Sequence, residues 1–136
     1  MIALDTNVLA RFLTQDEPDQ ARAASDLISD LTVDSPGFIC REVLVELVWV
    51  LQRSYKFSRT EISSVLEGLL SASELVIEEA DAIGSILQLY ETKGFGFSDL
   101  MIRQAARRWG SHYLATFDKK AALLDGVELV ELNQPQ

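Results

Sequence analysis

The feature that most constrains the fold is a regular alternation of short apolar runs with longer segments of helical periodicity. Runs of this length between turn residues are typical of buried strands, and the segments between them repeat their apolar residues every three to four positions. Strands that alternate with helices predict an α/β fold with a mostly parallel sheet. The predicted strands are Met1–Leu4, Phe38–Cys40, Leu75–Ile77, Tyr113–Phe117 and Val127–Leu132.

The segments between these runs contain recognisable helix boundaries. Ser58 and Glu61 form a capping-box pattern, and Gly94 and Gly110 are placed to end helices. Ser98 is expected to cap the helix that follows it. The residues expected to face inward are Ala24, Leu27, Ile28 and Leu31; Ile62, Val65, Leu66 and Leu69; Ile83, Ile86, Leu87 and Tyr90; and Ile102, Ala105, Ala106 and Trp109.

Length and composition indicate one globular domain whose core needs no disulfide or metal cross-link. At 136 residues the chain has room for a single core, so we predict one domain over residues 1–132 and a frayed tail at 133–136. Its one cysteine, Cys40, excludes an intramolecular disulfide and a cysteine-rich zinc site. No apolar run reaches the length of a membrane span, and the N-terminus lacks the basic region of a signal peptide. We therefore expect a cytoplasmic protein.

The formal net charge of −9 argues against a protein that coats nucleic acid by bulk electrostatics. It is compatible with a protein that binds divalent cations, because hard cations prefer oxygen ligands. Most other catalytic patterns are missing: His112 is the sole histidine, and the sequence has no G-x-S-x-G elbow and no P-loop. Residues 94–99 match half of a dinucleotide-binding fingerprint, but they follow a helix instead of the first strand, so a dinucleotide site is not expected there. Carboxylates are the remaining candidates.

Two aspartates follow predicted strands. Asp5 ends the first strand and Asp118 ends the fourth. In parallel α/β sheets functional groups gather at the carboxyl ends of strands, so both can face one crevice. The alternative is that each caps the helix that follows it.

Two further acids lie on predicted helices. Glu46 has mostly apolar neighbours one turn away, where a lone carboxylate needs a partner or a metal. Its alternative is an ion pair with Arg53, and Glu42 could be the functional acid in its place, although the setting of Glu46 is expected to be drier. Asp99 sits at a helix N-terminus, where capping or a pair with Arg103 is the alternative.

Carboxylates that converge would repel one another unless a divalent cation compensates. Mg²⁺ held by a few carboxylates binds phosphate oxygens, and a two-ion site can hydrolyse a phosphodiester without histidine, cysteine or lysine.

Taken together, Asp5-Thr6-Asn7, Glu46 in its helix, Ser98-Asp99 and Thr116-Phe117-Asp118 resemble the PIN domain, and more narrowly the VapC-type toxins of toxin–antitoxin pairs, over essentially the whole chain. This resemblance implies an endoribonuclease dependent on Mg²⁺ or Mn²⁺, with a three-layer fold and a five-stranded sheet ordered 3-2-1-4-5. It implies that Asp5, Glu46, Asp99 and Asp118 are the catalytic metal ligands and that Asn7 and Thr116 support them. It also implies a homodimer silenced by a small antitoxin. Some relatives carry another acid just before the third one, and residues 94–97 contain none, so a second ion is expected to bind weakly or to arrive with the substrate.

Basic residues near the acids are candidate RNA contacts. Arg103 and Arg107 are spaced one helical turn apart, and Lys119 follows Asp118 directly, together with Lys120. Local ion pairs are the alternative for each. One further cluster combines basic and aromatic residues and is suited to base stacking or to a partner protein, with an ordinary loop as the alternative. Its residues are Arg53, Tyr55, Lys56, Phe57 and Arg59.

A competing hypothesis is a flavodoxin-like phosphoacceptor that also gathers acids around Mg²⁺. Such a domain needs a lysine after the last strand, and none follows Leu132.

Overall fold

The structure, a computed structural model, describes residues 1–133. The chain forms two compact units: the first is Met1–Gly84 and the second begins at Ser85. The division falls inside the helix α5 (Ala80–Lys93). Each unit is described below by itself.

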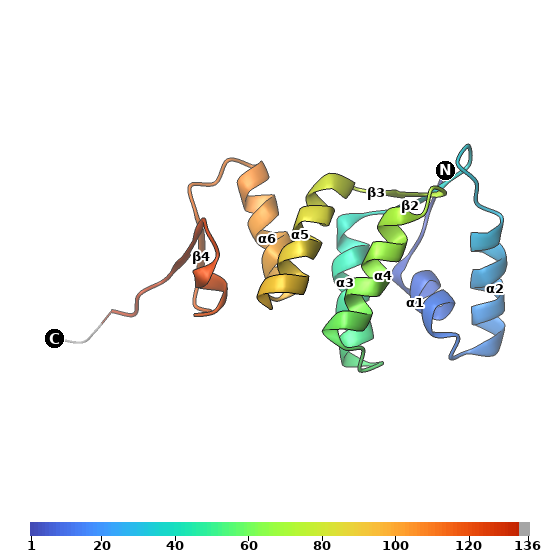
Figure 1. Cartoon of the computed structure of the whole chain (residues 1–136), viewed down its shortest axis with the longest axis horizontal. Helices are drawn as coiled ribbons and strands as arrows, with labels where there is room; N and C mark the ends of the chain where they lie inside the picture. The colour runs from blue at the N-terminus through green and yellow to red at the C-terminus, as the bar shows by residue number, and fades with distance from the viewer. Residues whose placement is uncertain (134–136) are drawn as a thin grey trace. The chain divides into compact units, whose positions relative to one another are not determined.

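The first unit is built on a parallel sheet. Its strands are β1 (Ile2–Ala3), β2 (Gly37–Ile39) and β3 (Leu75–Ile77), in the order β1-β2-β3, with Ala3 opposite Phe38 and Phe38 opposite Val76. Helices connect the strands, as parallel pairing requires, and Figure 1 shows them below β2 and β3. These helices are α1 (Thr6–Thr14), α2 (Pro18–Ser29), α3 (Arg41–Arg53) and α4 (Arg59–Ser71).

The core of this unit forms where helices pack on one another. α1 packs against α2 and α3, α3 packs against α4, and α4 packs against β3. Apolar residues spaced three or four apart put one face of α3 into this core, with Leu44, Leu47 and Leu51 fully buried. The predicted capping box of α4 is confirmed, because the Glu61 N–H donates to Ser58 Oγ (3.1 Å) and the Ser58 N–H donates to Glu61 Oε1 (2.9 Å).

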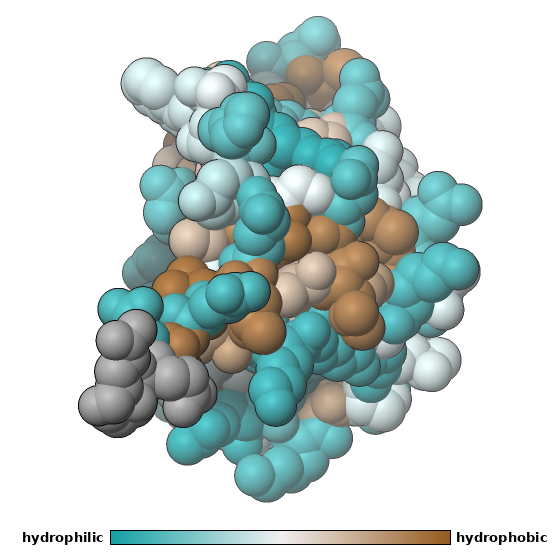
Figure 2. All heavy atoms as spheres, turned by 90° about the vertical axis from the view of Figure 1, so that its left-hand side faces the viewer, coloured by the Kyte–Doolittle hydropathy of each residue, from teal (hydrophilic) through white to brown (hydrophobic). Residues whose placement is uncertain are grey.

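The second unit combines helices with a parallel strand pair. It contains the rest of α5, then α6 (Phe97–Arg108), β4 (Leu114–Thr116), a 3₁₀ turn η1 (Ala121–Leu123) and β5 (Val127–Leu129), with β4 parallel to β5. Tyr90 of α5 meets Phe97 of α6 edge to face, with 6.1 Å between ring centroids. Apolar side chains also reach the surface of this unit. Figure 2 shows brown patches between polar residues on one face of the molecule.

The predicted start and buried face of α6 are wrong. The N-cap is Gly96, not Ser98, and the buried residues are Phe97, Leu100 and Met101. Ile102 and Trp109, expected to face inward, are 53% and 83% exposed. The segment carries two overlapping apolar patterns, one through Phe97, Leu100 and Met101 and one through Ile102 and Trp109. The contact of Phe97 with Tyr90 favours burial of the first pattern. In α2 the inward face is likewise shifted: Ala21 and Ala24 are buried, whereas Leu27 is exposed.

The α/β class and the parallel pairing of strands are confirmed. The described strands form sheets of three and two members, so the five-stranded sheet and the single domain over 1–132 stay predictions. The predicted tail lies outside the described residues from position 134 onward. Among the described residues, no helix has both the length and the apolar character needed to cross a membrane.

Candidate active site

Two of the predicted acids, Asp99 and Asp118, come together in the second unit. Asp99 lies in the first turn of α6, and Asp118 follows the end of β4. Burial raises the pKa of Asp99 above its usual value, and the negative charge of nearby Asp118 raises this pKa further. The two acids are therefore close enough to repel each other.

The carboxylate of Asp118 is held in a fixed orientation by the backbone. Its Oδ1 accepts the N–H groups of Lys120 (2.8 Å) and Ala121 (2.9 Å) at the start of η1. The Asp118 N–H in turn donates to Oγ1 of Thr116 (3.0 Å). The Asp118 side chain thus binds backbone N–H groups at the start of η1, although the N-cap residue of this turn is Lys120. Both bonds use Oδ1, so Oδ2 is the oxygen of Asp118 that could meet a ligand.

The loop before α6 contributes features that sequence reasoning missed. A Cβ atom at Gly96 would lie 3.1 Å from Oδ2 of Asp99, so glycine leaves the space that this carboxylate occupies. Gly94 has a φ of +73°, and a Cβ atom there would lie 3.5 Å from Nζ of Lys120. The ammonium beside this loop therefore belongs to Lys120, one of the two lysines predicted as phosphate contacts together with Lys119. The sequence signal was the pair of glycines at 94 and 96, which resembled a dinucleotide fingerprint.

Arg103 and Arg107 are turned toward one residue. The carbonyl oxygen of Asp125 accepts from Nη1 of Arg103 (3.1 Å) and from Nη2 of Arg107 (3.1 Å). Arg107 also forms an ion pair with the Asp125 carboxylate (3.2 Å). The ion pair of Arg107 matches the alternative for that residue, whereas the contact of Arg103 is with a backbone carbonyl. The role of both arginines in binding RNA stays a prediction.

The other two predicted acids, Asp5 and Glu46, belong to the first unit, on helices that pack together. Asp5 is the N-cap of α1, and its Oδ1 accepts the Thr6 N–H (2.8 Å). Glu46 is exposed on α3, and so is Glu42, so exposure does not distinguish the two acids and the choice between them stays a prediction. The residue proposed to pair with Glu46, Arg53, lies over the ring of Trp49, with 5.6 Å from its guanidinium carbon to the centroid.

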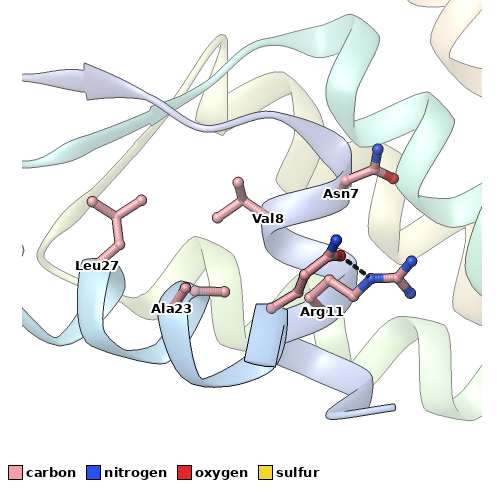
Figure 3. Close-up of a pocket in the computed structure, with 7 residues that line it drawn as sticks. Asn7, Val8, Arg11, Ala23 and Leu27 are labelled. Carbon is pink, nitrogen blue, oxygen red and sulfur yellow. Dashed lines mark hydrogen bonds between the residues drawn. The ribbon is translucent and has the colours of Figure 1, made fainter. Parts of the chain in front are cut away.

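Asn7, the predicted supporting residue, lines a hollow between α1 and α2. The hollow has a volume of about 380 Å³ and apolar walls that include Val8, Ala23 and Leu27. Figure 3 shows Asn7 and Arg11 toward one end and Leu27 at the other, with Arg11 donating to Gln20 (2.8 Å).

The donor set fits a divalent cation better than any other cofactor. Asp99 and Asp118 offer hard carboxylate oxygens in a repulsive pair, which Mg²⁺ or Mn²⁺ would relieve. Within each unit, the described residues contain no group of three or more His, Cys, Asp or Glu side chains placed to hold an ion. A pair of protein carboxylates is compatible with Mg²⁺, which keeps several water ligands.

The α/β fold brings an acid at a helix start close to an acid at a strand end, and the comparison with protein families identifies the class of this fold. The chain belongs to the PIN domain family, whose model matches residues 2–127. It is also similar to a VapC ribonuclease of Aquifex aeolicus (strain VF5), with 27% identity over 121 residues that cover 88% of this chain and 89% of the relative. The resemblance to PIN domains of the VapC type is confirmed.

Proposed function

We propose that the protein is a divalent-metal-dependent endoribonuclease and the toxin of a type II toxin–antitoxin pair. The observation that carries the proposal is the Asp99–Asp118 pair, because two mutually repelling carboxylates suit a divalent cation that can in turn bind a phosphodiester. Membership in the PIN family and the similarity to a VapC ribonuclease support the choice of RNA as substrate. Membership in this family also argues against the phosphoacceptor alternative.

The chain's own residues have distinct tasks in this proposal. Asp99 and Asp118 hold the ion, and the N–H groups of Lys120 and Ala121 keep Asp118 in orientation. Lys120, whose ammonium lies beside the loop before α6, is proposed to neutralise a phosphate of the substrate. A bound Mg²⁺ or Mn²⁺ supplies an activated water and stabilises the leaving oxygen of the phosphodiester.

We extend the proposal to the whole quartet on the strength of the family resemblance. Asp5 and Glu46 are proposed as further ligands, with Asn7 and Thr116 as supporting residues, in a sheet ordered 3-2-1-4-5. β1 and β4 are edge strands of the described sheets, so each has a backbone edge open to pairing. Nuclear Overhauser effects between backbone protons of β1 and β4 would test this order. Pairing of the edge of β1 that lies opposite β2 with a strand other than β4 would contradict it.

The deciding experiment measures cleavage of single-stranded RNA by the purified protein. With Mg²⁺ or Mn²⁺ the protein should cut, and EDTA should stop the reaction until metal is restored. Asp99→Asn should lower the rate by about a thousand-fold, since a catalytic ion contributes several kcal/mol to transition-state stabilisation. Circular dichroism of the variant serves as the folding control.

A folded Asp99→Asn protein with unchanged activity would refute the assigned site. Cleavage that persists in EDTA would refute metal dependence.

The same proposal predicts two binding partners, a second copy of the chain and an antitoxin. The protein is expected to form a homodimer, which sedimentation equilibrium measures directly. It is also expected to copurify, inactive, with a small antitoxin encoded by a neighbouring gene. Absence of any inhibitory product from the neighbouring genes would contradict the toxin assignment while leaving the nuclease untouched.

A further inference from the structure

An exposed aromatic side chain on α3 forms a surface that the proposed function does not yet use. Trp49 is 55% exposed, although tryptophan is a residue that usually buries most of its ring. The guanidinium of Arg53 lies over the ring at 5.6 Å from its centroid. Trp49, Gln52, Arg53 and Lys56 line a shallow hollow of about 510 Å³, which we call the Trp49 ledge.

The charge of the ledge is opposite to that of the chain. The described residues that line it carry two positive charges and no negative one, whereas the whole protein has a net charge of −9. A polyanion is therefore attracted to this place and repelled by much of the remaining surface. The combination of a flat aromatic face with cations is the one that single-stranded nucleic acids use, since bases stack on the ring and phosphates meet the cations.

The backbone holds Lys56 beside the helix. Its φ is +59°, in the left-handed region, and the Phe57 N–H donates to the Leu51 carbonyl (2.9 Å) where the chain turns back. The second cation of the ledge is thus positioned by this turn and not by a long flexible loop.

The ledge shares a helix face with a proposed metal ligand. Glu46, Trp49 and Arg53 are spaced three and then four residues apart, and all three are exposed. Trp49 lies about 4.5 Å and Arg53 about 10 Å farther along the helix axis than Glu46. This face of α3 therefore has an acidic residue, Glu46, at one end, suited to a cation. At its other end it has Trp49 and Arg53, which are suited to RNA.

We propose that the Trp49 ledge binds the single-stranded RNA substrate next to the cleaved bond, with one base stacked on Trp49 and its phosphates against Arg53 and Lys56. This rests on the proposed function in naming RNA and in using Glu46. It assigns a substrate-binding role to residues on the side of α3 that faces away from the core.

Binding is measured without cleavage, by the fluorescence of a single tryptophan. The probe is a roughly ten-residue 2′-O-methyl oligoribonucleotide, within the usual site size for single strands, added without metal. In Trp109→Phe protein the remaining Trp49 should be quenched by the probe. In the matched Trp49→Phe protein, which keeps only the 83% exposed Trp109, the signal should not change.

Affinity changes give the second measurement, by anisotropy of a labelled probe. Trp49→Ala should weaken binding by about 5- to 150-fold, as the loss of one stacked base does, and Trp49→Phe should retain most of the affinity. With cleavable RNA, Trp49→Ala should raise KM and leave kcat nearly unchanged.

The two cations are tested through salt dependence. Arg53→Gln and Lys56→Gly should each reduce the slope of log affinity against log salt by about 0.7. Glycine suits the left-handed backbone at 56, so this variant should not lose stability. The control Arg22→Gln removes the same charge from the exposed side of α2 and should leave the slope unchanged.

The outcomes separate this inference from the nuclease assignment. Equal affinity of the wild-type and Trp49→Ala proteins, with cleavage intact, overturns the ledge alone. A Trp49→Ala protein that becomes monomeric in sedimentation while binding the probe normally also overturns it, because the surface is then a contact between copies. Quenching at Trp49 in a protein that cuts no RNA supports the ledge and refutes the nuclease.

Discussion

At the scale of single residues, the candidate site depends on space as much as on charge. The Asp99 carboxylate occupies volume that any side chain at position 96 would share, and Asp118 depends on two backbone N–H groups for its orientation. The acids themselves were predicted from the sequence. The glycine that makes room for one of them was not, because its role is visible only when the loop and the first turn of α6 are seen together.

Gly96→Ala should impair the metal site without unfolding the protein. The backbone at 96 (φ −67°, ψ 141°) accepts alanine, but the added Cβ forces the Asp99 carboxylate to shift. We expect about a 10- to 100-fold rise in the Mg²⁺ concentration that cleavage requires, as for other residues that support a metal ligand. A titration of activity against Mg²⁺ measures this rise. Gly68→Ala is the control, since a Cβ atom at 68 meets nothing within 4 Å; equal Mg²⁺ requirements in both variants would disprove the crowding argument.

A second residue-scale prediction concerns acid stability. The hydrogen bond from the Tyr55 hydroxyl (2.6 Å) lowers the pKa of Asp16, and bonds from Thr14 and Arg11 assist. A lowered pKa in the folded state means that Asp16 stabilises the protein above its unfolded pKa, and that this contribution is lost as the pH falls through the folded value. Asp16→Asn should therefore lower the melting temperature at pH ~7 and make little difference well below pH ~3. A constant difference at both pH values would show that Asp16 acts through packing instead.

At the scale of elements, local rules explain most boundaries. α4 begins where its capping box lies, and α5 ends before Gly94, whose φ is +73°. These signals are short-range, because a cap needs only a side chain and an N–H group three residues away. α6 is the exception, since its start and its buried face follow from the packing of Phe97 on Tyr90.

Ser58→Ala should therefore destabilise the protein by about 1 kcal/mol, the usual effect of losing an N-cap. The matched change Ser64→Ala, at an exposed position inside the same helix, should be neutral or slightly stabilising because alanine is the better helix former. Urea denaturation of the two variants gives the comparison. A Ser58→Ala protein as stable as Ser64→Ala would mean that tertiary contacts alone hold the start of α4.

At the scale of the whole molecule, an excess of acidic residues is combined with a fold that gathers some of them. A net charge of −9 destabilises a compact chain through self-repulsion, and the Asp99–Asp118 pair concentrates that repulsion at one place. A cation that binds the folded protein should therefore contribute to global stability as well as to catalysis.

Mg²⁺ should raise the melting temperature of the metal-free protein. An ion that binds only the folded state stabilises it by about 3 kcal/mol when its concentration is about 100 times Kd. Asp99→Asn should melt higher than the wild type in EDTA, because one of two like charges is gone, and should gain less from Mg²⁺. Differential scanning calorimetry with and without metal measures both effects. Melting temperatures that do not respond to millimolar Mg²⁺ would contradict a site preorganised in the folded protein.

The sequence alone determined the α/β class, the strand and helix order and the identity of the acidic candidates, because apolar periodicity and caps act over a few neighbouring residues. Only the tertiary structure decided which face of α6 is buried, that Asp99 and Asp118 perturb each other, and that Arg103 and Arg107 engage Asp125. It also decided that Glu46 is exposed beside Trp49. These properties depend on contacts between residues distant along the chain, and their energies are set by burial and charge separation, which no local pattern encodes.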